Sequence, residues 1–297
     1  MARCEVRQLA DRVHARSVAG TPGARFDAGM KTEKPDTGNI RRAMLRIEGT
    51  RLEAAWWGLD APPGLVLLHE GLGSVGLWRD WPAALARATE RCVFAWSRAS
   101  YGRSESCALP RPLDYHDAEA ALLPAVLDAA GAGACVLVGH SDGATIAALH
   151  AVGRPDRRVR GVVLLAPHYF VEPICLAGLA AARQAWEQGD LRARLARHHG
   201  DVAAAFHGWN DTWLNPAFRG WDVRGRLAGL GVPALQIQGS GDQYGTTAQT
   251  DALERAAPGR VETLVLPVGH TPHQEAAAAV LAAVADFTQR RLGVTAG

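Results

Sequence analysis

The stretch Gly139-His140-Ser141-Asp142-Gly143 is the part of the sequence that most strongly indicates the fold. It follows a short apolar run at 134–138 and precedes small, mostly apolar residues at 144–150. Gly-x-Ser-x-Gly between a strand and a helix is typical of a sharp turn that exposes a nucleophilic serine. A Cβ at either flanking position would collide with the neighbouring strand or helix, so both positions need glycine. The pattern predicts Ser141 at a helix N-terminus, where backbone N–H groups and the helix dipole favour an oxyanion. The alternative is an ordinary structural turn.

Two later loops supply the partners that a serine nucleophile needs. Asp242 follows the apolar run 233–238, and His270 follows the run 261–268. Both therefore lie just beyond probable parallel strands, at the edge where open α/β sheets place their ligands. An imidazole takes the proton of the serine, and a carboxylate orients the imidazole. We predict a catalytic triad of Ser141, Asp242 and His270.

Other residues of these segments offer alternative roles. Asp242 could cap its own loop, since aspartate often accepts from nearby backbone N–H groups. His270 could be a surface loop histidine. Asp251 is a weaker candidate for the acid because it falls inside an expected helix, and His273 is a second candidate for the base at the start of the final helix.

An oxyanion hole requires two backbone donors. One is expected to be the N–H of Asp142, the residue after the nucleophile. The other is expected in the glycine-rich turn 70–74, which follows a predicted strand at 65–69. Glycines there let the backbone direct an N–H group toward the substrate oxygen. We favour Gly71 as this donor, with Leu72 as the alternative.

Together these motifs resemble the α/β-hydrolase superfamily, and the resemblance covers roughly residues 45–292. It implies an α/β-hydrolase fold, with a mostly parallel central sheet, helices on both faces and an inserted helical cap. It also implies the triad roles given above and the chain order Ser141, Asp242, His270. The segments that carry it are 68–74, 100–104, 139–143, 239–242 and 269–270.

Two details distinguish this chain within that superfamily. Many relatives have His-Gly after the oxyanion strand, whereas this chain has His69-Glu70-Gly71, which leaves the second donor open. The Ser-Asp-Gly form of the elbow resembles valacyclovirase-type hydrolases. A carboxylate at Asp142, with Glu70 nearby, could receive a cationic group and would repel an anion. The alternative is that Asp142 bonds helix N-terminal N–H groups.

Composition limits the partners. The 297 residues carry a net charge of +2 and no basic stripe, which argues against nucleic acid and membrane surfaces as partners. No 18-residue apolar run and no secretory signal are visible, and the cysteines at 4, 92, 107, 135 and 175 form no metal-binding or redox spacing. We expect a cytoplasmic protein with reduced thiols, a small-molecule substrate and no cofactor or metal. A homodimer is left open.

The expected organisation has four parts. Residues 1–40 form a flexible N-terminal extension, and Met30 is an alternative start that would leave residues 1–29 outside the native protein. Residues 41–168 and 227–297 form the two parts of the hydrolase core. Residues 169–226 form a helical cap, with helices expected at 177–186 and 190–199.

The predicted cap contains four of the nine tryptophans. Trp209 and Trp213, together with Trp78 near the oxyanion loop, could line an apolar acyl pocket, or they could pack the cap onto the core. Arginines 192, 194 and 197 could bind a carboxylate or a coenzyme A phosphate. A solvent-exposed helix face is the favoured interpretation of these arginines. His198 and His199 are also expected at solvent-exposed helix positions.

The sequence therefore predicts a serine hydrolase that cleaves a carboxylic ester, or a related acyl bond, of a small apolar or aromatic substrate. The alternatives are hydrolysis of a C–C bond in a ring-fission product, and thioesterase or acyltransferase activity on acyl-CoA. A non-catalytic ligand receptor is disfavoured by the complete triad.

Overall fold

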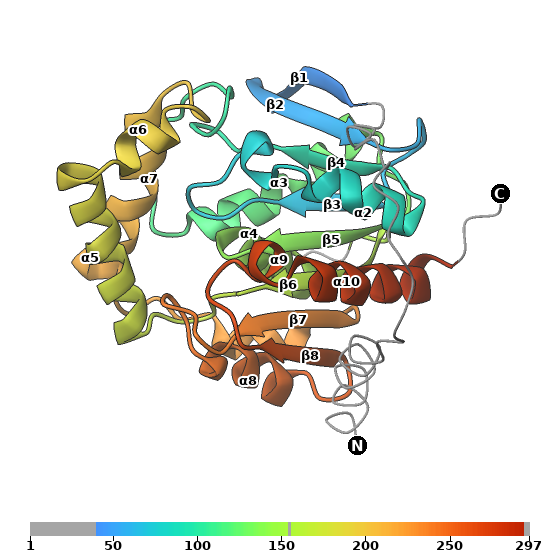
Figure 1. Cartoon of the computed structure of the whole chain (residues 1–297). Helices are drawn as coiled ribbons and strands as arrows, with labels where there is room; N and C mark the ends of the chain where they lie inside the picture. The colour runs from blue at the N-terminus through green and yellow to red at the C-terminus, as the bar shows by residue number, and fades with distance from the viewer. Residues whose placement is uncertain (1–39, 154–155, 294–297) are drawn as a thin grey trace, which may run out of the picture.

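An eight-stranded sheet forms the centre of the protein (Figure 1), seen here in a computed structural model that describes residues 40–153 and 156–293. The strand order is β1-β2-β4-β3-β5-β6-β7-β8. β1 pairs antiparallel with β2, and β2 pairs antiparallel with β4, while the pairs from β4 through β3 to β8 are parallel. The strands are β1 (Arg41–Ile47), β2 (Thr50–Trp57), β3 (Leu65–Leu68), β4 (Val93–Trp96), β5 (Cys135–His140), β6 (Val159–Leu165), β7 (Ala234–Gly239) and β8 (Val261–Leu266).

The central strands are apolar on both sides because helices cover both faces of the sheet. In β3, Leu65 and Leu67 pack into one hydrophobic cluster, whereas Val66 and Leu68 pack into the other. The side chains of a strand alternate between faces, so one short apolar run supplies two cores. The α/β-hydrolase fold expected from the sequence is confirmed.

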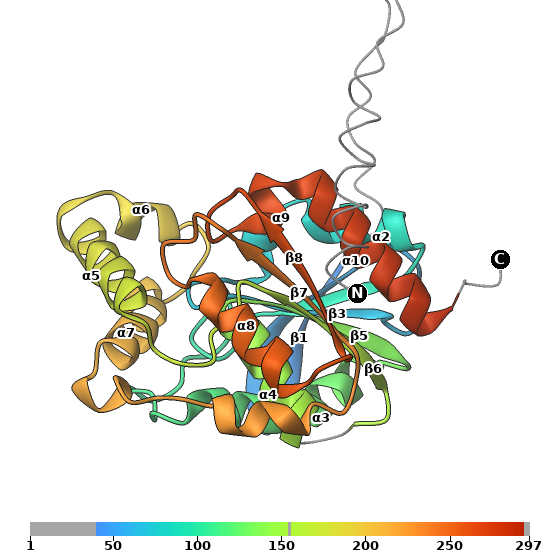
Figure 2. The same cartoon turned by 90° about the horizontal axis from the view of Figure 1, so that it is seen from below.

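Two helical layers enclose this sheet (Figure 2). α2 (Trp81–Thr89) and α10 (Ala277–Leu292), with the short α9 (Pro272–Glu275), cover one face. α3 (Tyr115–Ala130), α4 (Asp142–Gly153) and α8 (Thr247–Ala256) cover the other. Only Ser141 separates β5 from α4, so the elbow lies between a fully buried strand and a helix that is buried from Asp142 to Ala151.

A helical insertion, which we define as 169–226, lies between β6 and β7 and stands apart from both layers (Figure 1). It contains α5 (Pro173–Gln188), α6 (Leu191–Leu195) and α7 (Val202–Trp213), and a third hydrophobic cluster of its own. α6 ends at Leu195 rather than at the expected residue 199, and α7 was not anticipated. Short 3-10 helices occur at Val75–Trp78, Pro216–Phe218 and Arg224–Gly229.

The division into four parts stays a prediction. The expected extension lies outside the described residues except for Ile40, as does the alternative start at Met30.

The contact between β5 and α4 gives a first prediction. A Cβ on Gly139 would lie 2.2 Å from the carbonyl oxygen of Gly143, and backbone cannot move away cheaply. We expect Gly139→Ala to lower the free energy of unfolding by about 2–3 kcal/mol and the Tm by roughly 5–10 °C. Thermal and urea unfolding measure both. Gly220→Ala is the control, because its added Cβ would meet nothing within 4 Å. Equal stability of the two variants would contradict this account of the elbow.

Candidate active site

Ser141 occupies a strained turn between β5 and α4. Its φ is +53°, in the left-handed region that a residue with a side chain adopts only where the surroundings force it. The turn is held by the Ser141 N–H, which donates to the carbonyl oxygen of Leu165 at 2.8 Å. On the other side, a Cβ on Gly143 would lie 2.0 Å from the carbonyl oxygen of Leu68. The two glycines therefore allow the close approach that presents Ser141.

The structure brings the three predicted triad residues together. His270 Nε2 lies 3.0 Å from Ser141 Oγ, and His270 Nδ1 lies 2.8 Å from Asp242 Oδ2. A carboxylate only accepts, so Nδ1 carries the proton and Nε2 is free to accept from the serine hydroxyl. Among the hydrogen bonds and ion pairs of residues 40–153 and 156–293, none joins the alternatives, Asp251 on α8 and His273 on α9, to Ser141 or His270.

Asp242 caps its own loop as well as orienting His270. Its Oδ1 accepts from the N–H groups of Tyr244 (2.7 Å) and Gly245 (3.2 Å), and its Oδ2 also accepts from Gln238 Nε2 (2.8 Å). Burial alone would raise the pKa of Asp242, but His270 and the Tyr244 N–H hold it below its ordinary value. Asp242 therefore makes both kinds of contact that the sequence left open: Oδ1 caps the loop, and Oδ2 contacts His270.

The glycine-rich loop 70–74 lies beside Ser141, and hydrogen bonds with His69 and Arg98 hold it in place. The Arg98 N–H donates to His69 Nε2 (3.0 Å), so His69 Nδ1 carries the proton and donates to the Glu70 carbonyl oxygen (2.7 Å). Burial and the charge of Arg98 lower the pKa of His69, which keeps this ring neutral. The Arg98 guanidinium, 2% exposed, donates to the carbonyl oxygens of His69 and Glu70. Arg98 was not predicted from the sequence, where only its position just after β4 indicates a place near the site.

Three backbone N–H groups are available at this loop and at the elbow. Within the described residues, the N–H groups of Gly71, Leu72 and Asp142 donate to no protein acceptor. Gly71 also packs tightly against the insertion, since an added Cβ would lie 2.1 Å from Trp209 Nε1. Both favoured donors, Gly71 and Asp142, line the same cavity as Ser141.

The cavity above Ser141 has a volume of about 190 Å³. Trp209 and Trp213 line it, as predicted, and its lining includes no lysine or arginine. Trp78 does not line it; this ring packs against Trp81, at 5.5 Å between ring centroids, and against His273 at 5.2 Å. The lining residues that sequence analysis did not single out are His168, Cys175, Leu179 and Tyr244.

The Asp142 carboxylate is bonded within the protein and is only 1% exposed. Tyr115 Oη donates to it at 2.6 Å and Trp213 Nε1 at 3.2 Å. His116 and Arg98 lie 3.5 and 4.0 Å away. Burial alone would raise the pKa of Asp142, but these neighbours hold it well below its ordinary value, so it stays ionised. Neither expectation for this side chain, a cationic substrate or helix N–H groups, describes the contacts it makes.

Glu70 is the carboxylate left to face the cavity. Its side chain is 28% exposed, and Oε2 lies 3.5 Å from His140 Nδ1. Burial opposes its ionisation, but the contact with His140 lowers the pKa of Glu70 below its ordinary range. Within the part of the chain that the structure describes, the lining of the cavity contains two carboxylates, Glu70 and Asp142, and no lysine or arginine.

His168 is a neutral polar group in the cavity wall. It follows β6, at the same sheet edge as the triad loops, which was the sequence signal that could have identified it. The ring makes no side-chain hydrogen bond among the described residues, and its centroid lies 5.6 Å from that of His270. Burial and the nearby His270 lower the pKa of His168 to about 3. It is therefore an uncharged imidazole that can donate to, or accept from, a bound molecule.

The lowered pKa values of two buried histidines predict that the folded protein loses stability in mild acid. The pKa of His168 and that of His273 are both about 3 in the folded protein, against 6.5 as the ordinary value. Below pH 6.5 the unfolded chain takes up protons that the folded protein cannot, so stability falls as the pH drops toward 3. Each histidine contributes a slope of up to about 1.4 kcal/mol per pH unit.

We expect His168→Gln to reduce the difference in unfolding free energy between pH 7.5 and pH 5.5, as measured by urea unfolding. The exposed His207→Gln is the control. An undiminished difference in His168→Gln would show that this ring is not held neutral.

Among the described residues, no helix is both long and apolar enough to cross a membrane, and no three histidine, cysteine, aspartate or glutamate side chains are grouped to hold a metal ion.

Comparison with known proteins agrees with this geometry. Solved structures with the same fold include the enol-lactonase from Burkholderia xenovorans LB400 (22% identity, TM-score 0.61, covering 83% of this chain and 99% of that one). Proline iminopeptidase of Mycobacterium smegmatis is also similar (20% identity, TM-score 0.64, covering 84% of this chain and 98% of that one). So is naproxen esterase of Bacillus subtilis (18% identity, TM-score 0.66, covering 84% of this chain and 92% of that one). No curated protein matches the sequence. A model of the alpha/beta hydrolase family matches residues 65–284. The chain belongs to the alpha/beta hydrolase family.

Proposed function

We propose that this protein is a serine hydrolase that cleaves a carboxylic ester of a small apolar or aromatic substrate through an acyl-enzyme. The observation that carries the proposal is the unbroken chain of contacts from Ser141 Oγ through His270 to Asp242, at 3.0 and 2.8 Å, beneath a cavity of about 190 Å³. This arrangement matches a nucleophile, its base and the group that orients the base.

In the proposed mechanism, His270 Nε2 takes the proton of Ser141 as its oxygen attacks the ester carbonyl. The N–H groups of Asp142 and Gly71 stabilise the tetrahedral oxyanion, at about 3–4 kcal/mol for one donor in a comparable site. The C–O bond then breaks, and His270 gives its proton to the leaving alcohol. A water molecule, deprotonated by His270, attacks the acyl-enzyme and releases the acid and Ser141.

The cavity favours an ester over the alternative substrates. A ring-fission product or an acyl-CoA brings negative charge, and a carboxylate-binding arginine in the cavity would support either. The lining has no such cation and contains Glu70. Trp209, Trp213 and Leu179 supply apolar surface for an acyl or aryl group. We therefore infer a preference for neutral or cationic esters.

The role of Ser141 gives the first test. We expect Ser141→Ala to lower kcat for p-nitrophenyl esters by about 10⁴–10⁶-fold, since the other groups cannot replace the nucleophile. It should also abolish covalent labelling by a fluorophosphonate. The exposed Ser240→Ala, in the loop before Asp242, is the matched control and should retain both. Labelling that persists in Ser141→Ala would contradict the proposal, and a wild-type protein that is never labelled would favour a ligand receptor.

The role of Glu70 gives the second test. We expect the wild-type kcat/KM to fall in the order cationic, neutral, anionic across esters of matched size. Glu70→Gln keeps the shape but removes the charge, so discrimination against the anionic ester should fall roughly tenfold. Steady-state kinetics on the three esters measure it. Similar turnover of a dicarboxylate ester and its neutral analogue by the wild type would overturn the preference.

A further inference from the structure

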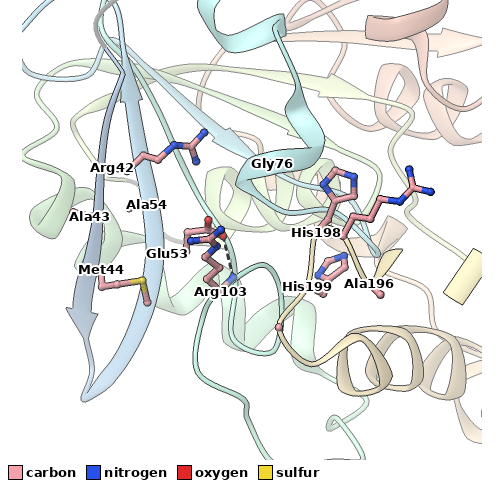
Figure 3. Close-up of a pocket in the computed structure, with 12 residues that line it drawn as sticks. Arg42, Ala43, Met44, Glu53, Ala54, Gly76, Arg103, Ala196, His198 and His199 are labelled. Carbon is pink, nitrogen blue, oxygen red and sulfur yellow. Dashed lines mark hydrogen bonds between the residues drawn. The ribbon is translucent and has the colours of Figure 1, made fainter. Parts of the chain in front are cut away.

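A larger groove lies outside the catalytic cavity (Figure 3). It has a volume of about 660 Å³ and lies between the β1–β2 hairpin and segment 196–200, which follows α6. The groove and the catalytic cavity share no lining residue. Its volume is within the range of pockets that hold small molecules and cofactors.

The groove is lined by cationic groups that lack partners. Arg42, Arg103 and Arg197 all line it, and within the described residues none of the three guanidinium groups has an ion-pair partner. The acidic residue in the lining is Glu53, whose carboxylate already accepts from Ser97 Oγ at 2.8 Å and from the Arg103 N–H at 3.0 Å. The lining therefore carries three positive charges and one negative charge. Figure 3 shows Arg42 on β1, Arg103 beside Glu53, and His198 and His199 on the opposite side of the groove.

The neighbouring arginines of the insertion are used differently. Arg194 lies 3.5 Å from Asp190, and the Arg192 guanidinium lies 5.5 Å from the centroid of the Trp186 ring. Of the three arginines that sequence analysis considered as an anion site, Arg197 alone belongs to this groove. The three arginines thus come from three separate parts of the fold, β1, the loop after β4 and the segment after α6, rather than from one helix face.

The groove adjoins the back of the glycine-rich loop. His199, expected on a solvated helix face, is instead 5% exposed and lies beyond the end of α6. The Gly102 N–H donates to His199 Nδ1 (3.0 Å), so Nε2 carries the proton and donates to the Leu72 carbonyl oxygen (3.0 Å). The Gly200 N–H donates to the Gly102 carbonyl oxygen at 2.7 Å. The wall of the groove is therefore built rigidly, against the loop that borders Ser141.

We propose that this groove binds a small organic phosphate. Guanidinium groups bind phosphate oxygens in a bidentate manner, and three of them suit a pyrophosphate or two phosphate esters. Ala43 and Met44 on β1 supply an apolar wall for the organic part of the ligand. The bounded volume and the net charge of +2 favour a small molecule over a nucleic acid.

Calorimetric titration tests the proposal with ADP, pyrophosphate and adenosine as probes. We expect ADP and pyrophosphate to bind at micromolar to millimolar Kd, more weakly as salt is added, and adenosine not to bind. The double variant R42Q/R197Q should raise the Kd for ADP at least tenfold. The control R160Q/R219Q removes the same charge at exposed, unpaired arginines elsewhere.

Four results would overturn the proposal: no binding of ADP or pyrophosphate, adenosine binding as tightly as ADP, an unchanged Kd in R42Q/R197Q, or an equal loss in R160Q/R219Q. Thermal unfolding of both double variants establishes that they are folded. The titration is repeated with Ser141→Ala, which should bind ADP like the wild type, so the outcome does not depend on the proposed hydrolytic activity. Adding coenzyme A distinguishes the source of the phosphate: tighter binding than ADP points to a thioester substrate, and equal binding points to a free nucleotide.

Discussion

The close approach of β5 to α4 is the constraint on which the site depends. Gly139 and Gly143 leave no room for a side chain, and Ser141 between them takes a left-handed conformation. Such strain costs on the order of 1–3 kcal/mol. It persists because β5 is fully buried, paired on both sides, and continued by a helix that is itself covered. The sheet therefore holds Ser141 in this conformation.

The carboxylate of Asp142 joins this elbow to the helical insertion. An ionised group that is 1% exposed is stable only when it is hydrogen-bonded, and here Tyr115 on α3 and Trp213 on α7 supply the donors. Removing either donor would leave charge under-satisfied in a dry site, so α7 cannot shift freely relative to Ser141. The Asp142 side chain thus organises the cavity wall, and both of its carboxylate oxygens already accept hydrogen bonds within the protein.

The sequence predicted those features that depend on local pattern and failed where distant side chains meet. Apolar runs and the elbow glycines were sufficient for the strands, the sheet edge and the meeting of Ser141, Asp242 and His270, because parallel strands bring their C-terminal loops together. The direction of the Asp142 side chain depended on Tyr115, 27 positions earlier, and on Trp213 in α7, a helix that was not expected. Trp78 was misjudged for a similar reason: nearness to the glycine-rich loop says nothing of the stack with Trp81 and His273.

The loop 70–74 and the residues that follow it separate two regions of opposite charge. On one side, Glu70 gives the catalytic cavity negative potential; on the other, Arg42, Arg103 and Arg197 give the groove positive potential. Because like charges repel strongly where water is scarce, a phosphate would be rejected by the first region and attracted by the second. His199, which lines the groove, links the two regions through its hydrogen bonds with the Gly102 N–H and the Leu72 carbonyl oxygen. Because the two sites share no lining residue, an anion in the groove would not compete for the space above Ser141.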